Sequence, residues 1–205
     1  MKVICCQFDL AWEDAAANLA TIRRLLGAGC PPAGSLVVLP EMCLSGFSME
    51  TARIAEPEGG PLERALSHLA REHGVHLLAG LVVSSSSDKP CNQSVLFSPE
   101  GAVSGRYRKM QPFTLGGESA SYTAGERCEF FQVGDCLVAP FICYDLRFPE
   151  LFRVAAWRRP QLYTVIASWP DKRIQHWMKL LQARAIENQA YVAGVNRIGR
   201  DPALN

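Results

Sequence analysis

The segment Leu36-Val37-Val38-Leu39-Pro40-Glu41 gives the clearest structural signal in this sequence. Its first four residues are apolar and two are β-branched, which is typical of a short strand buried on both faces. Pro40 has no backbone N–H to continue a hydrogen-bond ladder, so we expect the strand to end there. Glu41 then lies just beyond the carboxyl end of the strand, where open α/β sheets commonly carry their chemistry.

The segments around this strand alternate between strand and helix patterns. Residues 3–7 predict a preceding strand, and residues 62–73 and 75–82 predict a following helix and strand. Between the first two strands, Asp14 can cap a helix that the Gly27-Ala28-Gly29 segment ends. Its apolar residues recur at helical spacing: Ala15, Leu19, Ile22, Leu25 and Leu26. This alternation favours a mixed α/β fold.

Two later strands are each followed by a reactive side chain. Residues 94–97 and 102–107 predict the two arms of a hairpin, and Lys109 follows the second arm. Residues 137–142 predict a buried strand, and Cys143 follows it directly. Residues 113–125 between these strands contain glycines and serines and are expected to form a loop.

The last third of the chain continues the same alternation. Residues 149–157 predict a helix with Pro149 in its first turn, and residues 163–167 and 191–195 predict strands. The helix between these strands is expected to present one apolar face, made of Ile174, Trp177, Met178, Leu181 and Ala185.

The composition is that of an ordinary globular protein with one domain. Hydrophobic residues make up 48% of the chain, and 21 Lys and Arg nearly cancel 20 Asp and Glu. A formal net charge of +1 gives no reason to expect nucleic acid or an acidic membrane as a partner. We therefore expect a small-molecule substrate.

The N-terminus and the cysteines indicate a cytosolic protein. Polar Gln7 and acidic Asp9 come too early for the apolar region of a signal peptide, and no apolar run is long enough to span a bilayer. The eight cysteines include no Cys-x-x-Cys pair, so neither a disulfide framework nor a zinc site is indicated. Reduced thiols in the cytosol are the expected state.

Three reactive side chains are thus predicted at strand ends: Glu41, Lys109 and Cys143. A thiolate is a strong nucleophile, a carboxylate can take the thiol proton, and an ammonium stabilises a developing oxyanion. Each residue alone has an ordinary explanation, as a turn glutamate, a surface lysine or a core cysteine. Together they favour a covalent hydrolase over a thiol-redox or metal protein, and over a binding or regulatory module without turnover.

The chain resembles the nitrilase superfamily of carbon-nitrogen hydrolases in three motifs and in their order: Leu39-Pro40-Glu41-Met42, Tyr107-Arg108-Lys109, and Ile142-Cys143-Tyr144-Asp145-Leu146-Arg147-Phe148-Pro149-Glu150. His176-Trp177 and residues 183–188 extend the resemblance, which runs from the first strand to about Arg200.

The resemblance implies an α/β fold of the nitrilase type, an αββα sandwich in which two sheets pack face to face between outer helices. It also implies a homodimer, because members usually pair through helices. The family's domain continues beyond the strand that residues 191–196 match. One domain is therefore expected over 1–205, incomplete after residue 200 and without the C-terminal strands.

For the reaction, the resemblance implies four acting groups: Glu41 as base, Cys143 as the nucleophile that forms a thioester, and Lys109 and the Tyr144 backbone N–H as oxyanion donors. The family also carries a second glutamate. Glu118 matches it, and Glu126 lies in the same region as an alternative. No metal or organic cofactor is implied.

The stretch around Trp169-Pro170, Arg173 and His176-Trp177 looks most like the omega-amidase branch, which releases ammonia from terminal amides of 2-oxo dicarboxylic acids. Such a substrate would be 2-oxoglutaramate or 2-oxosuccinamate. Arg173 or Arg147 could pair with its carboxylate. Aromatic side chains could wall the pocket: Phe47, Phe113 and Trp169. Another small amide, an N-carbamoyl compound, a nitrile or an inactive shortened member remain alternatives.

Overall fold

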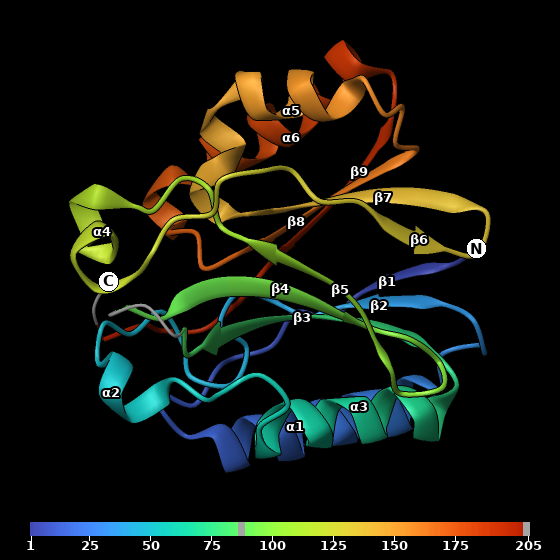
Figure 1. The fold of residues 1–205 in the computed structure, drawn as a ribbon, viewed down its shortest axis with the longest axis vertical. Coiled ribbons are helices and arrows are strands. Elements are labelled where there is room, and N and C mark those ends of the chain that lie inside the picture. Colours follow the sequence, from blue (N-terminus) through green and yellow to red (C-terminus); the bar gives the residue numbers. More distant parts are fainter. Residues whose placement is uncertain (86–88, 203–205) are drawn as a thin grey trace.

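The computed structural model describes residues 1–85 and 89–202. Two sheets pack face to face and helices cover the outer face of each, so the predicted αββα sandwich is confirmed (Figure 1). The range predicted for the domain, 1–205, includes residues 86–88 and 203–205, which lie outside the described residues. Within the described part of the chain, no helix has the length and apolar character needed to cross a membrane.

The first sheet has five strands in the order β1-β2-β3-β4-β5. β1, β2 and β3 are parallel, whereas β4 and β5 are antiparallel to their neighbours. The parallel strands are joined through helices, as the geometry of parallel pairing requires. The strands are β1 Val3–Cys5, β2 Leu36–Val38, β3 His76–Val83, β4 Cys91–Phe97 and β5 Val103–Arg108.

Helices α1 (Ala15–Gly29) and α3 (Pro61–His73) cover the outer face of this sheet (Figure 1). The predicted cap of α1 is confirmed, because the Asp14 side chain accepts a hydrogen bond of 2.9 Å from a backbone N–H of the first turn. Helix α3 ends at Gly74, whose left-handed φ of 60° suits glycine. A short helix, α2 (Thr51–Ile54), precedes α3.

The second sheet has four strands in the order β6-β7-β8-β9. β6 and β7 form an antiparallel hairpin, and the other two pairings are parallel. Two helices lie over its outer face (Figure 1). The strands and helices are β6 Phe131–Val133, β7 Cys136–Ile142, β8 Leu162–Ala167, β9 Tyr191–Asn196, α5 Pro149–Ala156 and α6 Ile174–Asn188.

Alternate residues of the strands supply two separate cores. In β2, Leu36 and Val38 belong to the core between the sheets, whereas Val37 belongs to the core beneath α1 and α3. The inter-sheet core also contains Tyr107 from β5 and Phe141 from β7, whose rings meet edge to face at 5.7 Å. The two sheets are therefore packed against each other near the ends of β5 and β7.

Two segments differ from the sequence prediction. The stretch 113–125 is not a plain loop, since it contains a 3-10 turn and the short helix α4 (Glu118–Ser121). In α6, Met178 was expected on the buried face but is exposed. The buried residues of α6 are Trp177 and Arg184, and the arginine is tolerated there because two of its guanidinium nitrogens are hydrogen-bonded.

Candidate active site

Three strand ends bring reactive side chains to one place. Glu41 follows β2, Lys109 follows β5, and Cys143 follows β7 as the first residue of the 3-10 helix Cys143–Arg147. All three side chains are withdrawn from solvent: Glu41 is fully buried, Lys109 is 2% exposed and Cys143 is 8% exposed. The candidate site is thus a buried cluster whose residues follow strands of both sheets.

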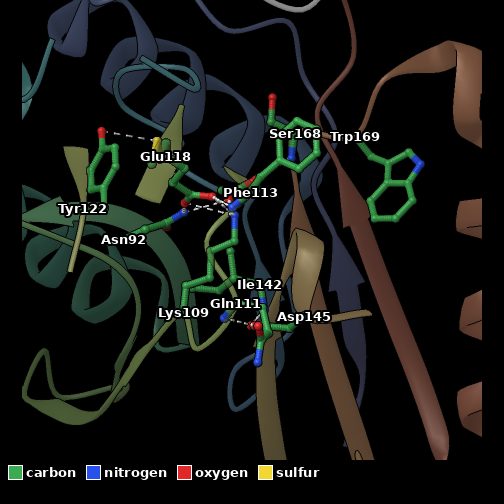
Figure 2. A network of polar contacts seen from close by, with 12 residues as sticks. Asn92, Lys109, Gln111, Phe113, Glu118, Tyr122, Ile142, Asp145, Ser168 and Trp169 are labelled. Carbon is green, nitrogen blue, oxygen red and sulfur yellow. Dashed lines mark hydrogen bonds and ion pairs between the residues drawn. The ribbon is translucent and has the colours of Figure 1, made fainter. Parts of the chain in front are cut away.

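Lys109 lies between two glutamates. Its Nζ donates to Glu41 Oε1 at 2.8 Å, and to Glu118 Oε1 at 3.0 Å and Oε2 at 2.8 Å. Figure 2 shows the long side chain of Lys109 extending to meet Glu118. Glu118 is fully buried whereas Glu126 is exposed, so the geometry favours Glu118 as the second glutamate.

A buried asparagine and a backbone N–H complete the contacts of Glu41. Asn92 in β4 donates from Nδ2 to Glu41 Oε1 at 2.7 Å and to Glu118 Oε1 at 2.9 Å, as Figure 2 shows for Asn92 and Glu118. Ser168, directly after β8, donates its backbone N–H to Glu41 Oε2 at 2.8 Å. Both oxygens of Glu41 are therefore held by donors, one set from each sheet.

Our sequence interpretation missed both of these residues. For Asn92 a signal existed, because the polar residues Asn92, Gln93 and Ser94 directly precede the apolar residues 95–97 of a strand. Burying a polar side chain costs free energy unless hydrogen bonds offset it, so a polar residue in a buried strand indicates a specific partner. For Ser168 no signal existed, since its backbone N–H is the donor and almost any residue carries one.

Burial and charge act differently on the lysine and the thiol. Burial alone would lower the pKa of Lys109, but attraction to Glu41 and Glu118 outweighs it and raises this pKa, so the ammonium stays charged. Burial raises the pKa of the Cys143 thiol well above its ordinary value, and the neighbouring Glu41 carboxylate raises it further. The resting nucleophile is therefore a neutral thiol that needs a base at the moment of attack.

The candidate nucleophile lies on a tight turn. Cys143 has a φ of 47°, in the left-handed region that residues other than glycine seldom adopt. Asp145 holds the turn, because its Oδ2 accepts hydrogen bonds from the Ile142 N–H at 2.9 Å and the Tyr107 hydroxyl at 2.8 Å. Burial raises the pKa of Asp145 to about 7. The N–H of Tyr144 belongs to the first turn of the 3-10 helix, where backbone donors lack a partner within the helix.

Strand β3 fixes the backbone of Glu41 from behind. The Gly80 N–H donates to the Pro40 carbonyl at 3.2 Å, and the Cys43 N–H donates to the Gly80 carbonyl at 2.9 Å. This close approach requires glycine, because a Cβ at position 80 would lie 2.6 Å from both Glu41 Cα and the Pro40 oxygen. The segment that carries Glu41 is thus packed directly against β3.

A small hollow opens beside Cys143. All of the predicted pocket residues line it, namely Phe47, Phe113, Arg147, Trp169 and Arg173. Its empty space is about 340 Å³, open solvent at its mouth included, which suits a substrate of a few heavy atoms. The Lys109 ammonium lies 5.3 Å from the centroid of the Phe47 ring, so Phe47 packs between the hollow and the buried lysine.

The two arginines of the hollow are not neutralised by a carboxylate. Arg147 stacks on the Trp169 ring at 4.7 Å, and its Nη2 lies 3.4 Å from His176 Nδ1. The Arg173 backbone carbonyl accepts the Trp169 indole N–H at 2.9 Å, and Arg173 lines the hollow beside Trp169. Neither guanidinium forms an ion pair with any residue in 1–85 or 89–202. The hollow therefore offers two free cations to an anionic group.

A further cavity is lined by Met42 and Gly80, and its empty space is about 720 Å³, open solvent at its mouth again included. Of its charged lining residues, Glu13 pairs with Arg53, Glu63 pairs with an arginine of β5, and Glu56 accepts a backbone N–H at 2.9 Å. Nothing in its lining calls for a ligand. In the part of the chain that the structure describes, no group of three or more His, Cys, Asp or Glu side chains could hold a metal ion.

Comparisons with known proteins identify the family of this chain. The profile of the carbon-nitrogen hydrolase family matches residues 2–204. The chain is 38% identical to omega-amidase YafV of Yersinia enterocolitica over 205 residues, which are 98% of this chain and 76% of that protein. It is 31% identical to 2-oxoglutaramate amidase of Bacillus subtilis over 201 residues, 98% of this chain and 77% of that protein.

A solved structure shares the fold. A CN-hydrolase superfamily protein from Xanthomonas campestris, determined with an arsenic adduct in its active site, aligns with a TM-score of 0.86 at 33% identity. The alignment covers 98% of this chain and 77% of that one. The two-sheet architecture is therefore shared along nearly the whole length described above.

Proposed function

Because this chain belongs to the carbon-nitrogen hydrolase family and is an amide-hydrolysing enzyme, we propose that it cleaves the terminal amide of a small carboxylic acid, as an omega-amidase does. The proposed substrates are 2-oxoglutaramate and 2-oxosuccinamate, and residues 1–205 are taken to act as one domain. The observation that carries the proposal is the pair of free guanidinium groups, Arg147 and Arg173, in the same small hollow as the Cys143 thiol.

The first half of the proposed reaction forms a thioester. Glu41 takes the proton of the Cys143 thiol while the sulfur attacks the amide carbonyl carbon, and the carbonyl oxygen becomes an oxyanion. The Lys109 ammonium and the Tyr144 N–H stabilise that charge. Glu41 then gives its proton to the amide nitrogen, the carbon-nitrogen bond breaks, and ammonia leaves.

The second half restores the enzyme. Glu41 takes a proton from a water molecule as the water oxygen attacks the thioester carbonyl carbon. The carbon-sulfur bond then breaks, the proton passes to the Cys143 sulfur, and the carboxylic acid leaves. Glu118 contacts Lys109 through both of its oxygens, which supports a role in keeping the ammonium in place through both halves.

The outer end of the substrate is proposed to meet Arg173. This residue lines both the hollow beside Cys143 and a wider outer hollow that also contains Lys172, so it lies where a substrate would enter. A planar guanidinium can pair with a carboxylate through two parallel hydrogen bonds. Phe47, Phe113 and Trp169 would wall the carbon chain between the two ends.

Ammonia release from 2-oxoglutaramate tests the proposal, with the parent protein beside Cys143→Ala at matched folding. We expect turnover in the parent and none above background in the variant, because the thioester cannot form without the thiol. A folded parent that is inactive on 2-oxo amides but cleaves a neutral amide, an N-carbamoyl compound or a nitrile would move the function to another branch of the family.

We also propose that two copies pair through the outer helices of the second sheet. Helices α5 and α6, which pack together, carry exposed apolar side chains on or directly after them: Val154, Trp157, Met178 and Ile186. Light scattering after gel filtration tests this, with twice the chain mass of 22.5 kDa expected for the parent and the single mass for Trp157→Glu. A parent that elutes with the single mass contradicts the dimer.

A further inference from the structure

The buried cluster contains one more acid than base. Glu41 and Glu118 face a single cation, Lys109, and all three side chains are withdrawn from solvent. An excess buried negative charge is costly unless hydrogen-bond donors surround it. The cluster must therefore take further donors from neutral groups.

Asn92 is the side-chain group that supplies them. Its amide nitrogen donates one hydrogen to Glu41 and the other to Glu118, and the residue is 2% exposed. Within the described residues, the amide oxygen of Asn92 has no hydrogen-bond partner. Because the side chain makes no other hydrogen bond, its amide serves the two carboxylates and does not tie β4 to a neighbouring element.

The contacts of Glu41 differ between its two oxygens. Oε1 receives two donors, Lys109 Nζ at 2.8 Å and Asn92 Nδ2 at 2.7 Å, which occupy both of its lone pairs. Among the described residues, Oε2 accepts one backbone hydrogen bond, from the Ser168 N–H at 2.8 Å, and keeps one lone pair, while the Cys143 thiol lies close enough to Glu41 for the carboxylate to raise its pKa. A thiol proton can therefore be accepted at Oε2 without breaking an existing hydrogen bond.

We propose that Asn92 is a positioning residue that saturates Oε1 of Glu41 and so makes Oε2 the basic atom toward Cys143. This inference rests on the proposed role of Glu41 as base. Among the described residues, Asn92 forms no hydrogen bond with the Cys143 thiol and does not line the hollow beside it. Without its amide, Glu41 can turn about its carboxylate axis and Glu118 loses a donor that holds it beside Lys109.

Two replacements of nearly the same size test the proposal. Asn92→Leu removes both donors, and Asn92→Asp replaces the amide with a third carboxyl group. We expect kcat for 2-oxoglutaramate to fall about 10- to 100-fold in Asn92→Leu with KM changed less than about threefold, because two hydrogen bonds to charged groups are lost and no substrate contact is touched.

The pH dependence of the activity of Asn92→Asp distinguishes a role of Asn92 in positioning the glutamates from a role in filling space in the core. An ionised carboxyl at position 92 repels both glutamates, whereas its protonated form can still donate one hydrogen bond. The activity of Asn92→Asp relative to the parent is therefore expected to rise about tenfold between about pH 8 and about pH 6. The relative activity of Asn92→Leu is expected to stay flat, because leucine does not titrate.

Gln93→Leu is the matched control. Gln93 is the next residue of β4, is equally buried and loses the same amide, but alternation along the strand directs its side chain away from the cluster. We expect its kcat to stay within about twofold of the parent, as for a change outside the site. Thermal unfolding followed by circular dichroism verifies that each protein is folded, and Asn92→Asp carries the test if Asn92→Leu does not fold.

A second readout does not depend on the substrate. Iodoacetamide alkylates Cys143 when the sulfur displaces iodide and the thiol proton passes to the base, and peptide mass spectrometry measures this rate at Cys143 alone. We expect a rate about tenfold lower in Asn92→Leu than in the parent or Gln93→Leu. If the parent cleaves none of the tested amides but shows this difference in alkylation rate, the proposed substrate is contradicted and the proposed role of Asn92 is supported.

Three results would overturn the proposal. The first is an Asn92→Leu protein that keeps at least half of the parental kcat or alkylation rate. The second is a relative activity of Asn92→Asp that does not change with pH. The third is a loss in Gln93→Leu as large as that in Asn92→Leu, which would make the effect one of buried amides in β4 in general.

Discussion

Gly80→Ala is expected to damage the candidate site without changing any group in it. The new Cβ would lie 2.6 Å from Glu41 Cα and from the Pro40 oxygen, and 2.7 Å from Met42 N. Ordinary van der Waals contacts of a Cβ begin near 3.4 Å. All three close atoms belong to the backbone, so no side chain can rotate away to make room.

The size of the effect follows from this overlap. Relief requires the Glu41 segment to move away from β3 by roughly 0.8 Å, and such overpacking costs about 1–3 kcal/mol of folding free energy. A shift of that size stretches the hydrogen bonds of Glu41, now 2.7–2.8 Å long, beyond useful length. Misplacement of a catalytic group by about 1 Å can cost about 100-fold in rate, so we expect kcat to fall by about that factor.

Urea unfolding and ammonia release from 2-oxoglutaramate measure the two effects on the same samples. Gly27→Ala is the matched control, because nothing lies within 4 Å of its added Cβ near the end of α1. That variant is expected to gain up to about 1 kcal/mol and to keep its kcat. A Gly80→Ala protein with parental stability and parental kcat would refute the reasoning.

Three further predictions follow from the charges of the site. Burial raises the pKa of Asp145 to about 7 in the folded state, above its unfolded value, so its contribution to the free energy of unfolding is full at low pH and is lost as the pH rises through 7. In urea unfolding, the parent should therefore lose stability between about pH 4 and about pH 7, and Asp145→Asn should lose less. An equal pH slope in parent and variant contradicts this. Glu118→Gln should lower kcat about 10- to 100-fold in steady-state kinetics with little change in KM, because Lys109 loses a charged partner; a rise in KM alone would point to a substrate contact instead. Arg173→Met should raise KM about 10- to 100-fold for a carboxylate-bearing amide but not for a neutral one, whereas the neighbouring Lys172→Met should change neither; equal effects on both amides speak against a carboxylate partner.

The strands that carry the candidate site could be predicted because their sequence signals are local. The apolar run before Pro40 and the run before Cys143 each predict a buried strand with a defined end. The sequence also indicated that Glu41, Lys109 and Cys143 each lie at a strand end, and the resemblance to the nitrilase superfamily implied that they act together. The structure brings Glu41, Lys109 and Cys143 together with Glu118.

What the sequence did not indicate depends on contacts between distant segments. The expected strand began at residue 94, and the structure extends β4 back to Cys91, which brings Asn92 into the sheet. Only the packing of the two sheets turns a strand asparagine into a partner of two glutamates. The Ser168 N–H and the close approach of Gly80 are likewise properties of the assembled sandwich.

The helix α6 shows the limit of periodicity. Its apolar residues recur at helical spacing, yet Met178 faces solvent and Arg184 is buried. Two of its guanidinium nitrogens donate, to the Leu146 carbonyl at 2.8 Å and to Glu187 at 3.0 Å, and the guanidinium lies over the Phe152 ring; among the described residues its buried Nε has no partner. A charged residue with several partners thus displaced an apolar one from the buried face, which no hydrophobic pattern can foresee.

The candidate base and nucleophile come from opposite sheets, and this ties chemistry to assembly. Glu41, Asn92 and Lys109 are anchored in the first sheet, whereas Cys143 and Ser168 are anchored in the second. Each layer alone could keep its ladders and its circular dichroism signal while holding only half of the reacting groups. An intermediate in which the two sheets are packed in the wrong position would give a native-like circular dichroism spectrum but would have no catalytic activity. Turnover therefore reports whether the two sheets are packed correctly.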